Sequence, residues 1–202
     1  MSDPVVSAPP KASATPARRG QSLVEFGLLL PLLLLLFGGI AQYGILIATS
    51  HTLTQVGRDL GRWVATQDAA DCPSIAAGTP SPIAQRAHDI AGETSLLGYQ
   101  GSPWLAPANF VSYGYGAMPA SPPSDQGVEV AWNIVDGTCP PDDSTTAAFV
   151  TVRLTHQSPV ILPGFGYLPG IGTCDADGCY LAIATTAVYR MEPTAPAPEP
   201  SP

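Results

Sequence analysis

The stretch Arg18-Arg19-Gly20-Gln21-Ser22-Leu23-Val24-Glu25-Phe26, together with the apolar run that follows it, decides the fold of this chain. Between Leu23 and Ala48 the sequence carries one charge, on Glu25. As a helix, residues 26–48 would rise roughly 34 Å, enough to cross a hydrocarbon core of about 30 Å. A carboxylate inside such a helix is costly, so Glu25 needs a partner or a function.

The spacing between Gly20 and Glu25 suggests that function. Cleavage after Gly20 would create a new amine on Gln21 and would make Glu25 the fifth residue of the product. In a stack of helices, this amine could neutralise the Glu25 carboxylate of a neighbouring subunit. The sequence therefore predicts a processed, self-associating helix.

The pattern of Gly20, four residues, Glu25-Phe26 and an apolar run resembles the prepilin peptidase site of type IV pilin-like proteins. The apolar run with Pro31 and the later segment Gly57-Arg58-Asp59-Leu60-Gly61-Arg62 are similar to the TadE-like family, pilin-like membrane proteins of tight-adherence (Tad, Flp-type) pilus machines. The resemblance is specific over residues 20–65 and looser up to residue 192. It implies a cleavage site at Gly20 and Gln21, assembly residues Glu25, Phe26 and Pro31, and a possible helix contact through Gly57, Arg58, Gly61 and Arg62.

The resemblance implies a minor pilin or pseudopilin rather than the main shaft of the pilus. Its implied partners are the membrane, a TadF-like or second TadE-like subunit, the major pilin, the inner-membrane platform and the prepilin peptidase. The chain would then be an enzyme's substrate and not itself an enzyme. The alternative is an uncleaved, single-pass membrane-anchored binding module, which would have no use for the Gly20–Glu25 spacing.

The charge distribution predicts how the chain is oriented in the membrane and argues against nucleic acid as a partner. The net charge is −8, and residues 49–202 carry five Arg against fourteen Asp and Glu. Such an acidic domain argues against nucleic-acid binding, which needs clustered Lys and Arg. Arg18 and Arg19 favour a cytoplasmic N-terminus, which places the following domain outside the cytoplasm, anchored in the cell (inner) membrane.

Periodicity predicts an α+β fold: a long helix packed on a small antiparallel sheet with one further helix. This arrangement resembles that of pilin-like proteins. Residues 1–20 are expected to be a disordered cytoplasmic leader and 193–202 a disordered tail. Residues 21–70 form the long helix, with a membrane span at about 26–48, and 71–192 form the extracytoplasmic domain.

The long helix carries one apolar stripe, made by Leu53, Val56, Leu60 and Trp63. The second helix is predicted at 82–97, capped by Ser81, and strands at 109–113, 127–135, 149–155 and 180–191.

All four cysteines follow the apolar run, as expected on an oxidising side of the membrane. They allow three pairings. We favour Cys174–Cys179, closing a short turn, and Cys72–Cys139, joining the end of the helix to the sheet.

No cofactor, metal site or catalytic motif is predicted. The three histidines lack metal-ligand spacing, and neither a nucleophile elbow nor a phosphate-binding loop is present. One segment is unusual: residues 158–172 are apolar but interrupted by Pro and Gly. This segment is either a contact surface, for a partner or for the bilayer, or a loop folded back on its own core.

Overall fold

The computed structural model describes residues 18–67, 72–94, 96–99, 103–122, 126–134, 148–162, 172–174 and 178–191. The chain divides into two units, Met1–Ile40 and Ala41–Pro202. The predicted leader up to residue 17 and the predicted tail at 193–202 lie outside the described residues.

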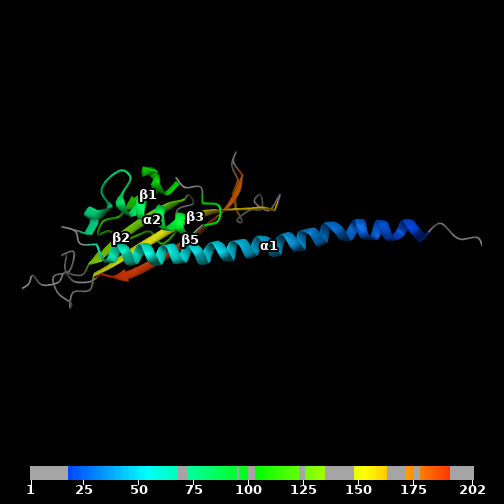
Figure 1. Cartoon of the computed structure of the whole chain (residues 1–202), viewed down its shortest axis with the longest axis horizontal. Coiled ribbons are helices and arrows are strands. Elements are labelled where there is room, and N and C mark those ends of the chain that lie inside the picture. The colour runs from blue at the N-terminus through cyan, green and yellow to red at the C-terminus, as the bar shows by residue number, and fades with distance from the viewer. Residues whose placement is uncertain are drawn as a thin grey trace, which may run out of the picture. The chain divides into compact units, whose positions relative to one another are not determined.

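The first element is the long helix α1, Arg18–Ala65, which confirms that the apolar run and the stripe after it form one continuous helix (Figure 1). It ends at Ala65, before the predicted residue 70. The backbone N–H groups of Thr66 and Gln67 donate to the carbonyls of Trp63 and Val64, three residues back, which tightens the last turn. The side chains of Thr66 and Gln67 also donate to the Trp63 carbonyl and satisfy it at the helix end.

The second helix, α2, is Pro82–Glu93, and its predicted N-cap is confirmed. The Ser81 hydroxyl oxygen accepts a hydrogen bond from the Ile83 N–H at 3.2 Å, and Pro82 occupies the first helical position. The helix is shorter than the predicted 82–97. Thr94 forms its C-cap, with the backbone N–H and the hydroxyl both donating to the Ile90 carbonyl.

The sheet has five strands in the order β1-β2-β3-β5-β4. Their bounds are Phe110–Ser112, Gly127–Ile134, Ala148–Pro159, Thr173–Cys174 and Cys179–Arg190 for β1 to β5. The three long strands β2, β3 and β5 pair antiparallel, as predicted, whereas β1 pairs parallel with β2, so the sheet is mixed. The described residues also include three short 3-10 helices, at Cys72–Ala76, Pro103–Leu105 and Pro107–Asn109.

One face of the sheet forms the core of the second unit with α2 and the C-terminal part of α1 (Figure 1). The predicted stripe is largely confirmed: Leu53, Val56 and Leu60 are fully buried, and Trp63 packs at the margin. Alternate residues of β2 and β3 meet this stripe, because their side chains share one face of the pleat. The fully buried core residues of these two strands are Val128, Val130, Ala148, Val150, Val152 and Leu154.

The opposite face of β2 and β3 carries a buried ion pair. Glu129 and Arg153 are 3% and 4% exposed and lie opposite each other in the antiparallel register. Arg153 Nε donates to Glu129 Oε2 at 2.8 Å, and its Nη2 donates to the Pro119 carbonyl at 2.7 Å. The Tyr113 hydroxyl donates to Glu129 Oε1 at 2.7 Å, which raises the pKa of Tyr113. The pair therefore fixes the segment after β1 to this face.

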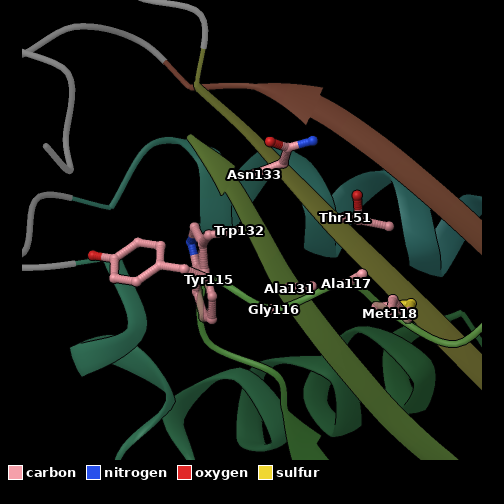
Figure 2. Close-up of a pocket in the computed structure, with 8 residues that line it drawn as sticks. All are labelled: Tyr115, Gly116, Ala117, Met118, Ala131, Trp132, Asn133 and Thr151. Atoms are coloured by element: carbon pink, nitrogen blue, oxygen red, sulfur yellow. The ribbon is translucent and has the colours of Figure 1, made fainter. Parts of the chain in front are cut away.

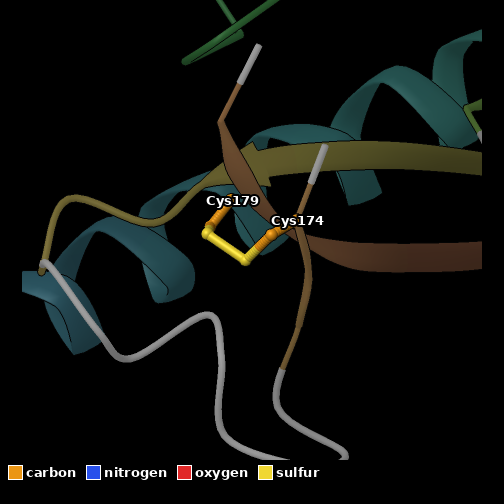
Figure 3. Close-up of a disulfide and its surroundings, with 2 residues drawn as sticks. All are labelled: Cys174 and Cys179. Atoms are coloured by element: carbon orange, nitrogen blue, oxygen red, sulfur yellow. A yellow bond between two sulfur atoms is a disulfide. The ribbon is translucent and has the colours of Figure 1, made fainter. Parts of the chain in front are cut away.

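The predicted disulfide between Cys174 and Cys179 is confirmed (Figure 3). It links β4 to the start of β5, where the two residues are also register partners. Cys72 is disulfide-bonded as well, and its sulfur lies 3.4 Å from the Met191 sulfur. Its predicted partner, Cys139, lies outside the described residues, so that pairing stays a prediction.

A buried histidine lies on the core face of β3. His156 is fully buried, and its ring packs edge-on to Trp104. Its Nε2 lies 2.9 Å from the Leu97 carbonyl oxygen and therefore carries the proton. Its Nδ1 is buried and has no hydrogen-bond partner among the described residues. Burial lowers the pKa of His156, because a second ring proton would have no acceptor.

Acidification is therefore expected to destabilise the folded chain through His156. The unfolded residue takes up a proton below its ordinary pKa of about 6.5, whereas the folded residue, with its lowered pKa, does not. The free energy of unfolding should fall as pH drops below this value, by at most about 1.4 kcal/mol per pH unit. Urea unfolding of the full chain in detergent at pH 7.5 and 5.5 measures this loss. His156→Gln should reduce the pH dependence, and an unchanged dependence would contradict the assignment.

Candidate assembly segment

The N-terminal part of α1 exposes apolar side chains on all sides. From Leu23 to Ile40, the exposed fraction of the large apolar side chains runs from 41% at Leu30 to 75% at Leu28. Within the described residues, α1 is one helix that is long and apolar enough to cross a membrane. Apolar area on this scale is unfavourable in water, at about 25 cal/mol per Å². Lipid or other apolar helices are the surroundings that suit it.

The predicted cleavage residues lie at the start of this helix. Gly20 and Gln21 fall in the first turns of α1, where backbone N–H groups have no intrahelical acceptor. Glu25 and Phe26 follow in the next turn, and both side chains are exposed. The amine that cleavage after Gly20 would free is the main-chain amine of Gln21, four residues, or about one turn, before Glu25.

Pro31 lies inside α1, and the helix continues through it. Proline has no N–H, so the Gly27 carbonyl four residues earlier lacks its usual intrahelical donor. A methyl group at Gly27 would meet no atom within 4 Å. The segment around Pro31 therefore combines a weakened hydrogen-bond ladder with open space beside the backbone.

Gly57 and Gly61 contact a strand rather than another helix. Both are buried, and they face β5. A Cβ on Gly57 would lie 3.0 Å from Thr185 Cγ2, and one on Gly61 would lie 2.6 Å from Tyr189 Cδ2. The two glycines therefore let the backbone of α1 approach the sheet closely.

Gly61→Ala is expected to destabilise the folded chain by about 1–3 kcal/mol, the usual cost of overpacking. The cost arises because the Tyr189 ring must move away from the new methyl group. Gly44→Ala is the matched control, since a Cβ there meets nothing within 4 Å and alanine favours the helix by about 1 kcal/mol. Urea midpoints of the two variants in detergent compare them. Equal stability would contradict the close packing of α1 on β5.

Arg58 and Arg62, by contrast, are exposed on α1. Arg58 and Thr54 form one wall of a groove of about 220 Å³, and residues 185–189 of β5 form the other. The four residues predicted as a possible helix contact thus face two ways. The two glycines pack against β5, and the two arginines are exposed, where a neighbouring subunit could contact them.

A larger cavity, of about 410 Å³, lies beside β2 and β3 (Figure 2). Residues 115–118 of the segment after β1 line one side, and Ala131, Trp132, Asn133 and Thr151 line the other. Figure 2 shows Trp132 and Asn133 pointing to opposite sides of β2. Among the lining residues, Tyr115 alone titrates, so the cavity offers no nucleophile with a base. No group of three His, Cys, Asp or Glu residues that could hold a metal occurs in the described part of the chain.

Two polar arrangements escaped the sequence reasoning. Gln42 is buried at 6% exposure and bonds the backbone at the end of β3, more than a hundred residues later. The Glu129–Arg153 pair is the second arrangement. The sequence did show a Glu and an Arg on the polar faces of two strands predicted to be neighbours. It did not show how the two strands are aligned, and this alignment decides whether the two residues lie opposite each other.

A comparison with known protein families gives a match that lies within α1. Residues 20–62 match the family model described as TadE-like protein. No curated protein and no solved structure matches the chain. The match begins at the predicted cleavage residue, and it includes the exposed apolar helix and the Gly-Arg segment. The N-terminal segment of this chain is therefore similar to TadE-like proteins over residues 20–62, in agreement with the resemblance seen in its sequence.

Proposed function

We propose that the chain is a minor pilin or pseudopilin of a Tad-type pilus assembly and secretion machine, processed by a prepilin peptidase after Gly20. One observation carries the proposal. The TadE-like match starts at Gly20 and extends over a helix whose apolar side chains are exposed and whose early turns hold one carboxylate, Glu25.

The mechanism is physical rather than catalytic. The apolar half of α1 inserts in the inner membrane with its N-terminus in the cytoplasm, and the second unit lies on the other side. The peptidase frees an amine on Gln21. A neighbouring subunit brings its own amine beside Glu25 and neutralises a charge that lipid disfavours. The open space beside Gly27, about one turn before Pro31, lets a second helix approach.

The proposed partners follow from this mechanism. They are the peptidase, other subunits with similar helices, namely a TadF-like or second TadE-like protein and the major pilin, and the inner-membrane platform. The exposed Arg58 and Arg62, one turn apart, are cations with which a neighbour's carboxylates could pair.

Gly20→Leu is expected to block processing, because a bulky residue replaces the glycine before the cut. Gly27→Leu is the matched control, since it introduces the same side chain where the structure is open and beyond the proposed cut. Immunoblots of membranes from cells that express the peptidase should show the long form for Gly20→Leu and the short form for Gly27→Leu and the wild type. A short form for Gly20→Leu would refute cleavage at this position.

A further inference from the structure

The first buried side chain along the described part of α1 is Gln42. Its amide binds the polypeptide at the end of β3 with both of its polar atoms. Gln42 Nε2 donates to the Pro159 carbonyl at 3.2 Å, and its Oε1 accepts from the Ile161 N–H at 2.8 Å. The end of β3 therefore lies at the level of residue 42 on the helix.

This contact limits how much of α1 can lie in hydrocarbon. If the span extended to residue 48, the end of β3 and residues 160–162 would lie within the lipid core. Lipid-exposed irregular backbone is not found there, because its polar groups would be unsatisfied. Residues 22–41 alone rise about 30 Å at 1.5 Å per residue, which already matches a hydrocarbon core.

Apolar side chains are exposed at the level of Gln42. The side chain of Ile161 is 65% exposed although its own backbone N–H donates to Gln42, and Tyr43 and Ile47 of α1 are 67% and 40% exposed. Tyrosine is enriched where a membrane span meets water, because its ring is apolar and its hydroxyl is polar. The backbone N–H groups of Val160 and Ile161 are both already bonded, to the Cys179 carbonyl and to Gln42. This segment can therefore leave bulk water with both of these donors satisfied.

We propose that Pro159–Leu162, with Tyr43 and Ile47, forms a lipid-contacting surface that rests in the interfacial layer of the bilayer on the side of the folded domain. The membrane-spanning part of α1 then ends near Ala41. The two hydrogen bonds of the Gln42 side chain, which we call the Gln42 clamp, hold the end of β3 at the membrane surface. The proposal rests on the membrane anchoring in the proposed function, but not on cleavage or pilus assembly. It also gives residues 42–48 their own reason to be apolar, since they face the interface and the domain instead of the bilayer centre.

The test places an environment-sensitive fluorophore at single introduced cysteines in the full-length chain, reconstituted at low density in phosphatidylcholine–phosphatidylglycerol vesicles. NBD-maleimide labels Ile161→Cys, and the vesicles carry lipids with a doxyl quencher at a shallow or a deep acyl position. The described cysteines are disulfide-bonded, and unlabelled wild type serves as the blank. Val188→Cys is the matched control, because Val188 is 59% exposed on β5, away from the Gln42 clamp. Leu33→Cys reports insertion of the anchor itself.

The expected result is a blue-shifted emission at position 161 with stronger quenching by the shallow than by the deep doxyl group, and no quenching at position 188. Water-like, unquenched emission at 161 would overturn the proposal. A blue-shifted but unquenched label would also overturn it, because protein rather than lipid would then cover the site. A label at position 33 that is not quenched would indicate failure of the anchor, so the two failures are distinguishable.

Discussion

Glu25→Ala is expected to leave membrane insertion intact and to reduce incorporation of the chain into pilus complexes by at least about tenfold, which corresponds to 1.4 kcal/mol. Insertion should persist because removing the carboxylate removes a cost, about 2.5–3.5 kcal/mol at the bilayer centre and less near its edge. Assembly should fail because the amine on Gln21 of a neighbour loses its counter-charge. Close charge pairs at protein interfaces contribute about 1.5–7 kcal/mol in coupling measurements, more than enough for a tenfold effect.

Carbonate extraction measures insertion, and co-purification with a tagged pilus subunit measures assembly. Glu25→Gln is the control that separates charge from shape: it keeps the size of the side chain and should assemble as poorly as Glu25→Ala. Glu25→Asp keeps the charge and should retain part of the assembly. Wild-type assembly of both neutral variants would refute the role of this carboxylate.

Arg153→Met is expected to lower the free energy of unfolding by about 3–5 kcal/mol, because it leaves the buried Glu129 carboxylate without its cation. The Tyr113 hydroxyl would remain as a donor to this carboxylate. A single donor does not replace the cation for a carboxylate that is only 3% exposed, so the charge stays buried and unpaired.

The matched variant is the double replacement Glu129→Leu with Arg153→Met, which removes both charges. It should be less destabilised than Arg153→Met alone, since it leaves no buried unpaired charge. Urea unfolding of the full chain in detergent at pH 7.5, followed by tryptophan fluorescence, compares the two variants with the wild type. A double variant as unstable as Arg153→Met would show that lost packing, and not the buried carboxylate, causes the instability.

The helices and long strands were predictable because each repeats one simple pattern. The apolar run and the Leu53–Trp63 stripe predicted α1, and Ser81-Pro82 predicted the start of α2. Alternation predicted β2, β3 and β5 and their antiparallel order. The helix ends were less predictable, because they depend on a few local hydrogen bonds at Thr66 and Thr94 that no repeating pattern announces.

The short strands were harder to predict. The pattern at residues 109–113 indicated β1 but not its direction, and β4, with two residues, has no pattern of its own. The parallel pairing of β1 brings Gly127 against the chain at Asn109, where a Cβ would lie 2.8 Å from the Asn109 carbonyl oxygen. A close approach of this kind is visible only once the chain is folded.

The polar contacts of the domain depend on residues far apart in sequence. The amide of Gln42 is an isolated polar group in an apolar run, and nothing local indicates that Pro159 and Ile161 will meet it. Glu129 and Arg153 lie on strands whose register is set by the whole sheet. The proposed cleavage residue Gly20 and the proposed assembly residues Glu25 and Pro31, in contrast, lie close together along one helix. The Gly20–Glu25 spacing and the family resemblance were therefore enough to suggest them.

The most direct test of the pilin-like account is the intact mass and N-terminal residue of the wild-type chain, purified from membranes with and without the cognate prepilin peptidase. The account predicts a peptidase-dependent product that begins at Gln21. A chain that keeps its original N-terminus under both conditions would contradict it and would favour an uncleaved membrane-anchored binding module.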